Sequence, residues 1–506
     1  MKIVRTVWRW FSGAPAGQNL GLALTLFCVG LLLTVFGERM PLADGLGYDG
    51  IEYGDWAMRL DALLDGRIPV SAYRVFRMLP SALAHGTLRL LGAGLTPDNV
   101  IRFFEVYNLG LLCLAALAWG GTADALDLGG RGKLLGFLGL FANHAVLKFN
   151  FYYPVLTDVS GYACAVFLLW AFVRSRPWLA VLITLAGTFC WPPLLLYGAI
   201  VLLFPRRDQV PGEPSRLAGT AAAILAAGGY GVLAATPLTG LTPHYPLAVA
   251  MVMVYLGGAA FCLFGSPCRV RPMLRRATTP GRLAIFAAAA VLAAVARLLI
   301  DKLVAHSGES GFFNLPLWQM VLAYLRTTCV PLSARFPGEF LVAHVLYFGP
   351  LLFLTGLFPI RVGAAAGRLG LGLLALTAAA AGHAVMPLSR QWLAGYPALV
   401  LVTVMAVRDV PLTRGFWAVF VGLSLLLSKV WLLFNLTPPL APGTGPGGDA
   451  PWTPGFSFEH YVSSTGRWMS FDWYFVQGVL LAAIFVCLYW YFHAPRCPAP
   501  PVGRRP

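Results

Sequence analysis

The sequence predicts an all-α fold, a polytopic bundle of about fourteen transmembrane helices, with thirteen possible. Only 11% of the 506 residues are charged and 58% are hydrophobic, whereas a soluble domain carries about a quarter charged residues. Apolar runs of spanning or near-spanning length recur along the chain. We therefore expect a single transmembrane domain over residues 1–493 and a disordered, proline-rich cytoplasmic tail at 494–506.

The apolar runs give the expected spans in order. The first, Leu20 to Phe36, is about as long as a full span and no A-x-A cleavage site follows it, which predicts a retained helix. The run 177–204 is too long for one helix, and Pro192 and Pro193 at its centre predict a tight helical hairpin. The other runs lie at 103–119, 133–148, 157–173, 216–236, 246–265, 283–300, 340–358, 369–386, 392–407, 414–433 and 474–492.

Basic residues predict the orientation of the chain. The segments assigned to the inside hold 22 Lys and Arg residues, Arg206, Arg368 and Arg408 among them, against five acidic ones that include Asp127, as expected of cytoplasmic loops. Both termini are then cytoplasmic, and the Ala-, Gly-, Leu- and Arg-rich composition is typical of a protein from the inner (plasma) membrane of a GC-rich bacterium. The net charge of +16 is a sign of orientation rather than of nucleic-acid binding, because the arginines are scattered over eight inner segments.

The first outer segment, residues 38–102, contains the main catalytic candidates. Six carboxylates lie within 22 residues, and Tyr73, Arg74 and Arg77 follow; the carboxylates are Asp44, Asp49, Glu52, Asp55, Asp61 and Asp65. A carboxylate can take the proton of an attacking hydroxyl, and arginines can neutralise a departing phosphate. A solvated, charged loop is the alternative. Apolar residues at helical spacing favour interfacial helices instead; they are Trp56, Leu60, Leu63 and Leu64.

Two shorter outer segments add further candidates. Asp158 follows Tyr153 where the chain re-enters the membrane, and it is either a functional group or a helix cap. His383, Arg390 and Tyr396 surround a later turn. An arginine at this depth needs an anionic partner, such as a lipid-linked phosphate, or it extends to the lipid headgroups.

The acidic first loop, with YDGIEY followed by AYRVFRMLPSALA, resembles that of the multi-spanning glycosyltransferases of the GT-C superfamily, in particular a bacterial subset that uses polyprenyl-phosphate sugars. The resemblance implies that Asp49 is the catalytic base and Asp158 a second catalytic carboxylate. It also implies donor-phosphate contacts from Arg74, Arg77 and Arg390. The expected substrate-binding residues are Glu52, Tyr73, Tyr153, His383 and Tyr396.

We therefore expect an inverting transfer of a sugar from a polyprenyl-phosphate donor to a glycan, lipid or protein acceptor on the extracytoplasmic face. Membrane lipids are the other expected partners, and no nucleic acid is expected. No cofactor and no metal are expected, because no HExxH or similar ligand spacing occurs. The alternatives are a secondary transporter or lipid flippase, or a noncatalytic protein of envelope assembly. Carboxylates concentrated in outer loops, and essentially absent from the middle of spans, favour interfacial chemistry over translocation.

Overall fold

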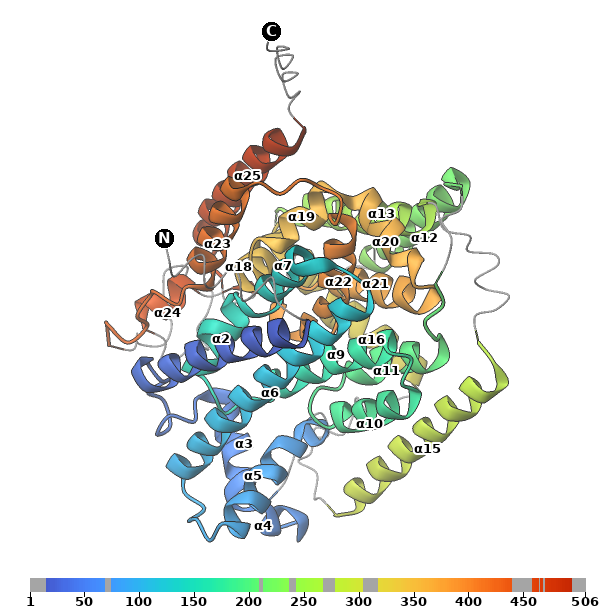
Figure 1. Ribbon diagram of the computed structural model, residues 1–506. Helices are drawn as coiled ribbons and strands as arrows, with labels where there is room; N and C mark the ends of the chain where they lie inside the picture. Colours follow the sequence, from blue (N-terminus) through green and yellow to red (C-terminus); the bar gives the residue numbers. More distant parts are fainter. Residues whose placement is uncertain are drawn as a thin grey trace.

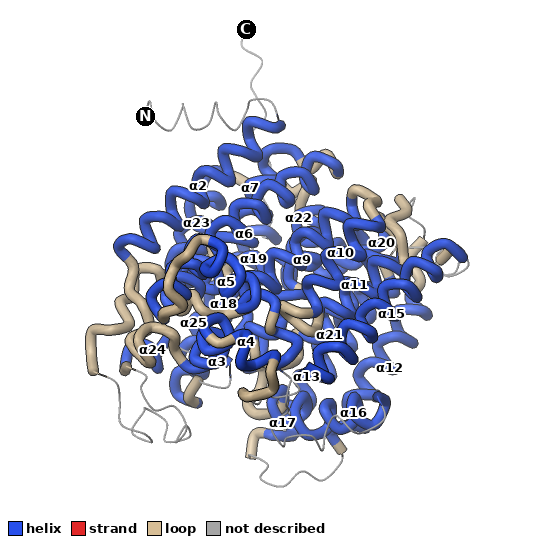
Figure 2. Tube along the Cα trace, turned by 90° about the horizontal axis from the view of Figure 1, so that it is seen from below, coloured by secondary structure: helices blue, strands red, loops and turns tan. Residues whose placement is uncertain are grey.

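The computed structural model describes most of the chain. The described residues are 15–68, 74–208, 213–235, 243–266, 278–303, 317–438, 457–463, 465–466 and 469–493. The predicted tail, the first fourteen residues and Tyr73 lie outside them. Within these ranges the regular secondary structure consists of helices, without any strand (Figure 2). The all-α prediction is therefore confirmed.

Five of the described helices are long and apolar enough to cross a membrane, which supports a membrane protein. They are α2 (Pro15–Phe36), α6 (Pro97–Ala125), α12 (Arg216–Ala234), α13 (Tyr245–Gly265) and α25 (Phe471–His493). Two bent pairs raise the count to seven if each pair is one span. The larger number of about fourteen stays a prediction.

The first bent pair interrupts the continuous span expected at 133–148, whereas the second begins within the run expected at 340–358 and extends beyond its end. The first consists of α7 (Gly129–Phe141) and the helical stretch η2 (Ala145–Phe149) and α8 (Asn150–Tyr152), which meet at 51°. Asn143 stabilises this break, because its amide nitrogen donates to the carbonyls of Gly139 and Leu140 while its side-chain oxygen accepts from the amide of Val146. The second pair is α19 (Leu351–Leu357) and α20 (Pro359–Arg368), bent by 96°.

Shorter apolar helices occupy most of the other expected runs. They are α9 (Asp158–Val173), α10 (Pro177–Thr188), α11 (Leu194–Leu203), α15 (Pro280–Leu303, apolar to Ala296), α18 (Glu339–Phe348), α21 (Leu371–His383), α22 (Tyr396–Ala406) and α23 (Arg414–Ser428). The hairpin expected at Pro192 and Pro193 is confirmed, since α10 and α11 pack against each other on either side of these residues.

The remaining elements are short. Those of the first outer segment are α3 (Tyr48–Met58), α4 (Leu60–Leu64), η1 (Arg74–Arg77) and α5 (Leu79–Leu90). The others are α16 (Leu317–Tyr324), η3 (Leu325–Cys329), α17 (Val330–Ser333), η4 (Ser389–Ala394) and α24 (Phe458–Ser463).

Burial separates a central group of helices from a peripheral one. All eleven residues of α22 are buried, as are most of those of α9, which lies between α6 and α11 in Figure 1. The long helices α2, α12, α13 and α25 instead expose many large apolar side chains. Such apolar surface suits contact with lipid chains, so the short buried helices form the centre of the bundle.

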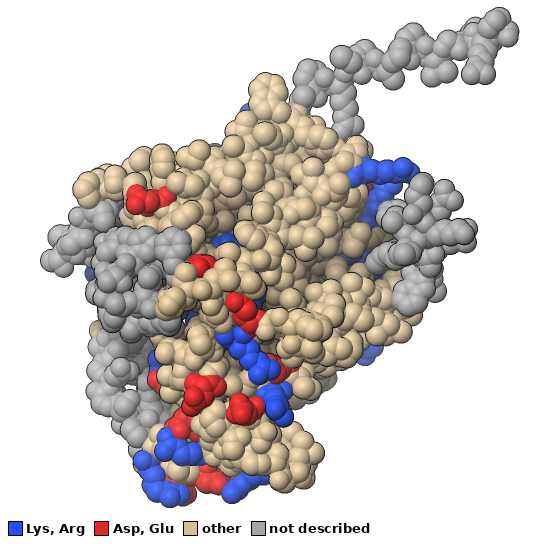
Figure 3. Space-filling view, turned by 90° about the vertical axis from the view of Figure 1, so that its left-hand side faces the viewer, with Lys and Arg blue, Asp and Glu red and all other residues tan. Residues whose placement is uncertain are grey.

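The first outer segment has a hydrophobic core of its own. Tyr53, Trp56 and Leu63 are buried against Ile101 and Phe104 at the start of α6. Leu60 is only partly buried and Leu64 is exposed, so the predicted apolar face is buried in part. Figure 3 shows charged side chains gathered at the lower end of the molecule, where Figure 1 places α3, α4 and α5. This subdomain sits over the end of the bundle where the predicted site residues meet.

Candidate functional site

Three predicted site residues that lie far apart in the sequence, Asp49, Asp158 and Arg390, meet in one network of hydrogen bonds. Arg390 on η4 donates from Nε and Nη2 to the two carboxylate oxygens of Asp158, at 2.8 and 3.0 Å. Its third nitrogen, Nη1, donates to Oδ2 of Asp49 at 3.3 Å. The guanidinium also lies 5.3 Å from the ring centre of Phe149, a cation–π distance. Arg390 therefore fixes both carboxylates relative to each other.

The local backbone explains how Asp49 reaches this position. Gly47 precedes α3 with φ of 70°, and a Cβ atom there would lie 2.4 Å from the ring of Tyr153. The absence of a side chain lets the ring approach the start of α3, where the Tyr153 hydroxyl accepts a hydrogen bond from the amide of Gly50 at 3.0 Å. Tyr153 thus anchors the helical turn that carries Asp49.

Asp158 is positioned by a helix start. It is the first residue of α9, where the amide groups and the helix dipole stabilise a negative charge. Its side chain is only 7% exposed. A carboxylate this buried requires a charged partner, and the two hydrogen bonds from Arg390 meet that requirement.

Asp49 is more accessible, with 36% of its side chain exposed, and Arg390 is 30% exposed. Burial raises the pKa of Asp49, but the positive charges of Arg390, Arg74 and Arg77 outweigh this effect and hold the pKa below its ordinary value of 3.8. Asp49 is therefore ionised at neutral pH, and about a third of its side chain is exposed.

Arg74 and Arg77 lie on η1 beside these carboxylates. Arg74 forms an ion pair with Glu52 and is one-third exposed. Arg77 is only 6% exposed; its Nη1 donates to the hydroxyl of Tyr53 at 3.3 Å, and its guanidinium lies 4.2 Å from the ring centre of Trp191. Arg74 is thus the more accessible cation, and Arg77 is held in place by aromatic neighbours.

Trp191 and Tyr53 are site residues that the sequence reasoning missed. Trp191 lies directly before the prolines at the break between α10 and α11, and its turn contacts the site: its ring lies against Arg77, and the amide of Leu79 donates to the carbonyl of Phe189. The indole Nε1 of Trp191 is buried and has no hydrogen-bond partner in the described part of the chain. The signal for Tyr53 was its spacing of four residues from Asp49, which places both on one side of a helix.

Other predicted site residues are not joined to this network. Tyr396 is fully buried at the start of α22, and its hydroxyl donates to the carbonyls of Gly139 and Phe348 at 2.9 and 3.2 Å. It is therefore packed inside the bundle and is not part of the Arg390 network. His383 ends α21 and takes no part in the ion pairs around Arg390.

Comparisons with known proteins do not identify a relative. No family model, no curated protein and no solved structure matches the chain. Among the described residues, no group of three His, Cys, Asp or Glu side chains is arranged to hold a metal ion. The arrangement of Asp49, Asp158 and the three arginines is therefore the basis on which a function can be proposed.

Proposed function

We propose that the chain is a membrane glycosyltransferase that moves a sugar from a polyprenyl-phosphate donor to an acceptor at the membrane face that carries Asp49. The observation behind the proposal is that an ionised, partly exposed Asp49 lies beside Arg390, Arg74 and Arg77 at the end of an apolar bundle. A lipid-linked sugar phosphate combines an apolar chain, a negative charge and a reactive carbon. The apolar bundle suits the chain, the arginines suit the negative charge, and Asp49 suits the reaction at the carbon.

Asp49 has the properties of the base in this reaction. As the acceptor hydroxyl attacks the anomeric carbon, a new C–O bond forms and the proton passes to the Asp49 carboxylate. The bond from the anomeric carbon to the phosphate oxygen breaks, and the polyprenyl phosphate leaves with the electron pair, so the configuration inverts. A weak base suffices, because the phosphate is a good leaving group and little proton transfer is needed before the C–O bond breaks.

The arginines divide into two roles in this proposal. Arg390 already binds two carboxylates, so in this proposal it orients Asp49 and Asp158. It no longer serves as the phosphate-binding residue that the sequence analysis expected. Arg74 and Arg77 are left to stabilise the charge on the leaving phosphate. Because Arg74 is paired with Glu52, a bound phosphate would replace Glu52 as its partner.

The test compares two aspartates of the same helix. Asp49→Asn removes the base, whereas Asp55→Asn removes a carboxylate that pairs with Arg59. Purified protein in liposomes would receive a panel of radiolabelled polyprenyl-phosphate sugars, with a bacterial envelope extract as the source of acceptor. We expect Asp49→Asn to lower transfer about a hundredfold or more and Asp55→Asn to leave it within about twofold.

Full transfer by folded Asp49→Asn protein would exclude this mechanism. Wild-type protein that moves the labelled lipid between leaflets without transferring its sugar would instead indicate a flippase. Size-exclusion profiles of both variants would control for folding.

A further inference from the structure

A second polar site lies at the opposite end of helix α9. The helix begins at Asp158 in the Arg390 network and ends at Val173, whose carbonyl accepts a hydrogen bond from Nη1 of Arg206 at 2.8 Å. Sixteen residues at a rise of about 1.5 Å each separate the two ends by about 24 Å. Helix α22 also leads from one site to the other. It starts just after η4, which carries Arg390, and near its end Met405 lines the second site together with Arg408.

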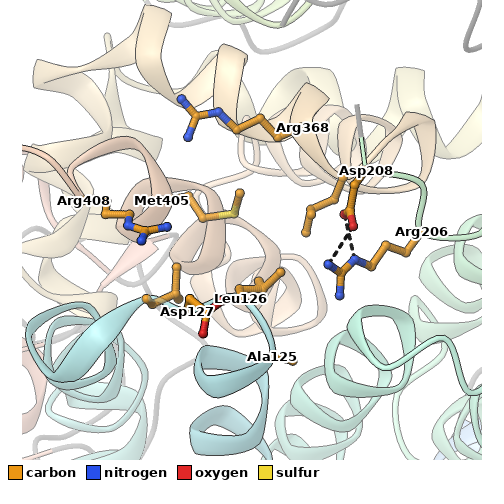
Figure 4. Close-up of a pocket in the computed structure, with 10 residues that line it drawn as sticks. Ala125, Leu126, Asp127, Arg206, Asp208, Arg368, Met405 and Arg408 are labelled. Carbon is orange, nitrogen blue, oxygen red and sulfur yellow. Dashed lines mark hydrogen bonds and ion pairs between the residues drawn. The ribbon is translucent and has the colours of Figure 1, made fainter. Parts of the chain in front are cut away.

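A pocket of about 450 Å³ opens at this second end. Three arginines from three separate connections line it: Arg206 after α11, Arg368 at the end of α20 and Arg408 after α22 (Figure 4). Arg206 is occupied, because it forms two hydrogen bonds with Asp208 at 2.9 and 3.0 Å. Arg368 and Arg408 form no ion pair with the described residues, and both are exposed.

The charge of the pocket favours an anion. Asp208 neutralises Arg206, which leaves Arg368 and Arg408 against the single carboxylate of Asp127. Helix α7 also begins at the pocket, with Leu128 as its N-cap residue and no side-chain cap. Its first amide groups and its dipole add positive potential.

The rest of the lining is apolar. Leu128, Leu369 and Met405 are buried side chains in the wall of the pocket. The volume lies within the usual range for small-molecule sites. A ligand that suits this lining combines an anionic group with apolar atoms.

We propose that this pocket binds the phosphate group of an anionic lipid headgroup through Arg368 and Arg408. The shared chemistry is that of a phosphate ester, and the lipid is the source that the apolar wall favours. The site is separate from Asp49 and independent of the transferase proposal.

Native mass spectrometry of the purified full chain, titrated with phosphatidylglycerol, tests this site. We expect Arg368→Gln/Arg408→Gln to weaken binding about tenfold or more, since each arginine can donate charge-assisted hydrogen bonds. The control Arg59→Gln/Arg67→Gln removes two exposed arginines of the first outer segment and should leave binding unchanged. Equal binding by wild type and the Arg368/Arg408 variant, or equal binding of phosphatidylcholine, would overturn the proposal.

A second variant changes binding in the opposite direction. Asp127 has φ of 49°, a conformation that asparagine tolerates well, so Asp127→Asn removes the repelling charge with little backbone strain. We expect it to bind phosphatidylglycerol a few times more tightly, and unchanged or weaker binding would contradict the site even if the arginine variant does not fold. Competition by excess inorganic phosphate would support the arginine site and identify soluble phosphate as its source, whereas lack of competition would identify the lipid.

Discussion

At the scale of single residues, the guanidinium of Arg390 is the group on which the candidate site depends. A planar fork of nitrogens can bind both oxygens of Asp158 and still reach Asp49, which the single ammonium of lysine cannot do with the same geometry. Arg390→Lys should therefore keep the charge but lose the fixed angle between the carboxylates.

Removing the charge of Arg390 should change the pH dependence of activity. Arg390 helps to hold the pKa of Asp49 below 3.8, so Arg390→Gln should raise that pKa and move the acid limb of the pH–rate profile for sugar transfer to higher pH. The overall rate should also fall about tenfold or more, because Asp49 and Asp158 lose their common partner. Arg59→Gln is the matched control. Coincident acid limbs for Arg390→Gln and wild type would show that Arg390 does not tune Asp49.

The same shift affects stability. A carboxyl group whose pKa is lowered by folding stabilises the protein above its unfolded pKa, and this contribution is lost as the pH falls through the lower, folded value. The stabilising effect of Asp49 is thus present at neutral pH and disappears only below about 3.8. Melting temperatures of wild type and Arg390→Gln should accordingly converge in strong acid.

Asp158 and Arg390 could be nominated from the sequence because each is a charged group at the edge of an apolar run, whereas Asp49 was singled out from six carboxylates by the resemblance to GT-C enzymes. Their pairing could not be predicted, since Arg390 lies 232 residues from Asp158 and 341 from Asp49. For that reason Arg390 was expected to bind a phosphate, and the structure gives it two carboxylates. Trp191 was missed because an aromatic residue in an apolar run has no distinctive spacing.

At the scale of helices, small residues determine how closely neighbours approach. A Cβ atom on Gly136 of α7 would lie 1.8 Å from the ring of Trp119 on α6, and Trp119 is fully buried. We expect Gly136→Ala to destabilise the protein by about 1–3 kcal/mol through overpacking, measured as a lower melting temperature in detergent. Gly110→Ala, on the same helix as Trp119 but with open space around it, should be neutral. Equal melting temperatures for the two variants would contradict the close approach.

Glu38 joins three elements just beyond the end of α2. Its carboxylate accepts from Nζ of Lys148 at 3.1 Å and from the amides of Phe434 and Asn435 at 2.6 and 2.9 Å. Glu38→Ala should leave these donors without their acceptor, at a cost of about 1–3 kcal/mol. Hydrogen–deuterium exchange at 434 and 435 should become faster. Asp65→Ala, which removes an exposed carboxylate that pairs with Arg67, should leave that exchange unchanged.

Helix boundaries were predictable where proline marks them. Pro192 and Pro193 predicted the hairpin of α10 and α11, because proline cannot continue a helix. The break between α7 and η2 has no proline. It depends on the side chain of Asn143 satisfying backbone groups on both sides, which an apolar run does not reveal.

At the scale of the whole molecule, segments that the charge pattern predicted to lie on the same side of the membrane also lie together in the structure. Asp49, Asp158 and Arg390 come from three predicted outer segments and meet at one end of α9. Asp127, Arg206, Arg368 and Arg408 come from four predicted inner segments and meet around one pocket at the other end. The alternation of basic and acidic loops is therefore consistent with which connections lie together, while the orientation of the two ends stays a prediction. The number of spans was less predictable, because short buried helices such as α22 do not have the length of a lipid-facing span.

Cysteine labelling can determine which end faces the cytoplasm. In a variant without the nine native cysteines, Arg67→Cys and Asp208→Cys place single thiols at exposed positions near the two ends. An impermeant maleimide added to intact bacterial spheroplasts should label Arg67→Cys at once and Asp208→Cys only after permeabilisation. The reverse pattern would place Asp49 in the cytoplasm and eliminate the transferase proposal.

The shortness of α9 has an electrical consequence. Between Asp158 and Arg174 the helix carries no charged residue, so under the predicted topology it would separate two aqueous faces by about 24 Å, less than the roughly 30 Å of a bilayer's hydrocarbon layer. Any membrane voltage then drops over a shorter path at the centre of the protein than in the surrounding lipid. Under the same topology, the carboxylates at one end of α9 and the arginines at the other would lie at the two ends of this shorter voltage drop.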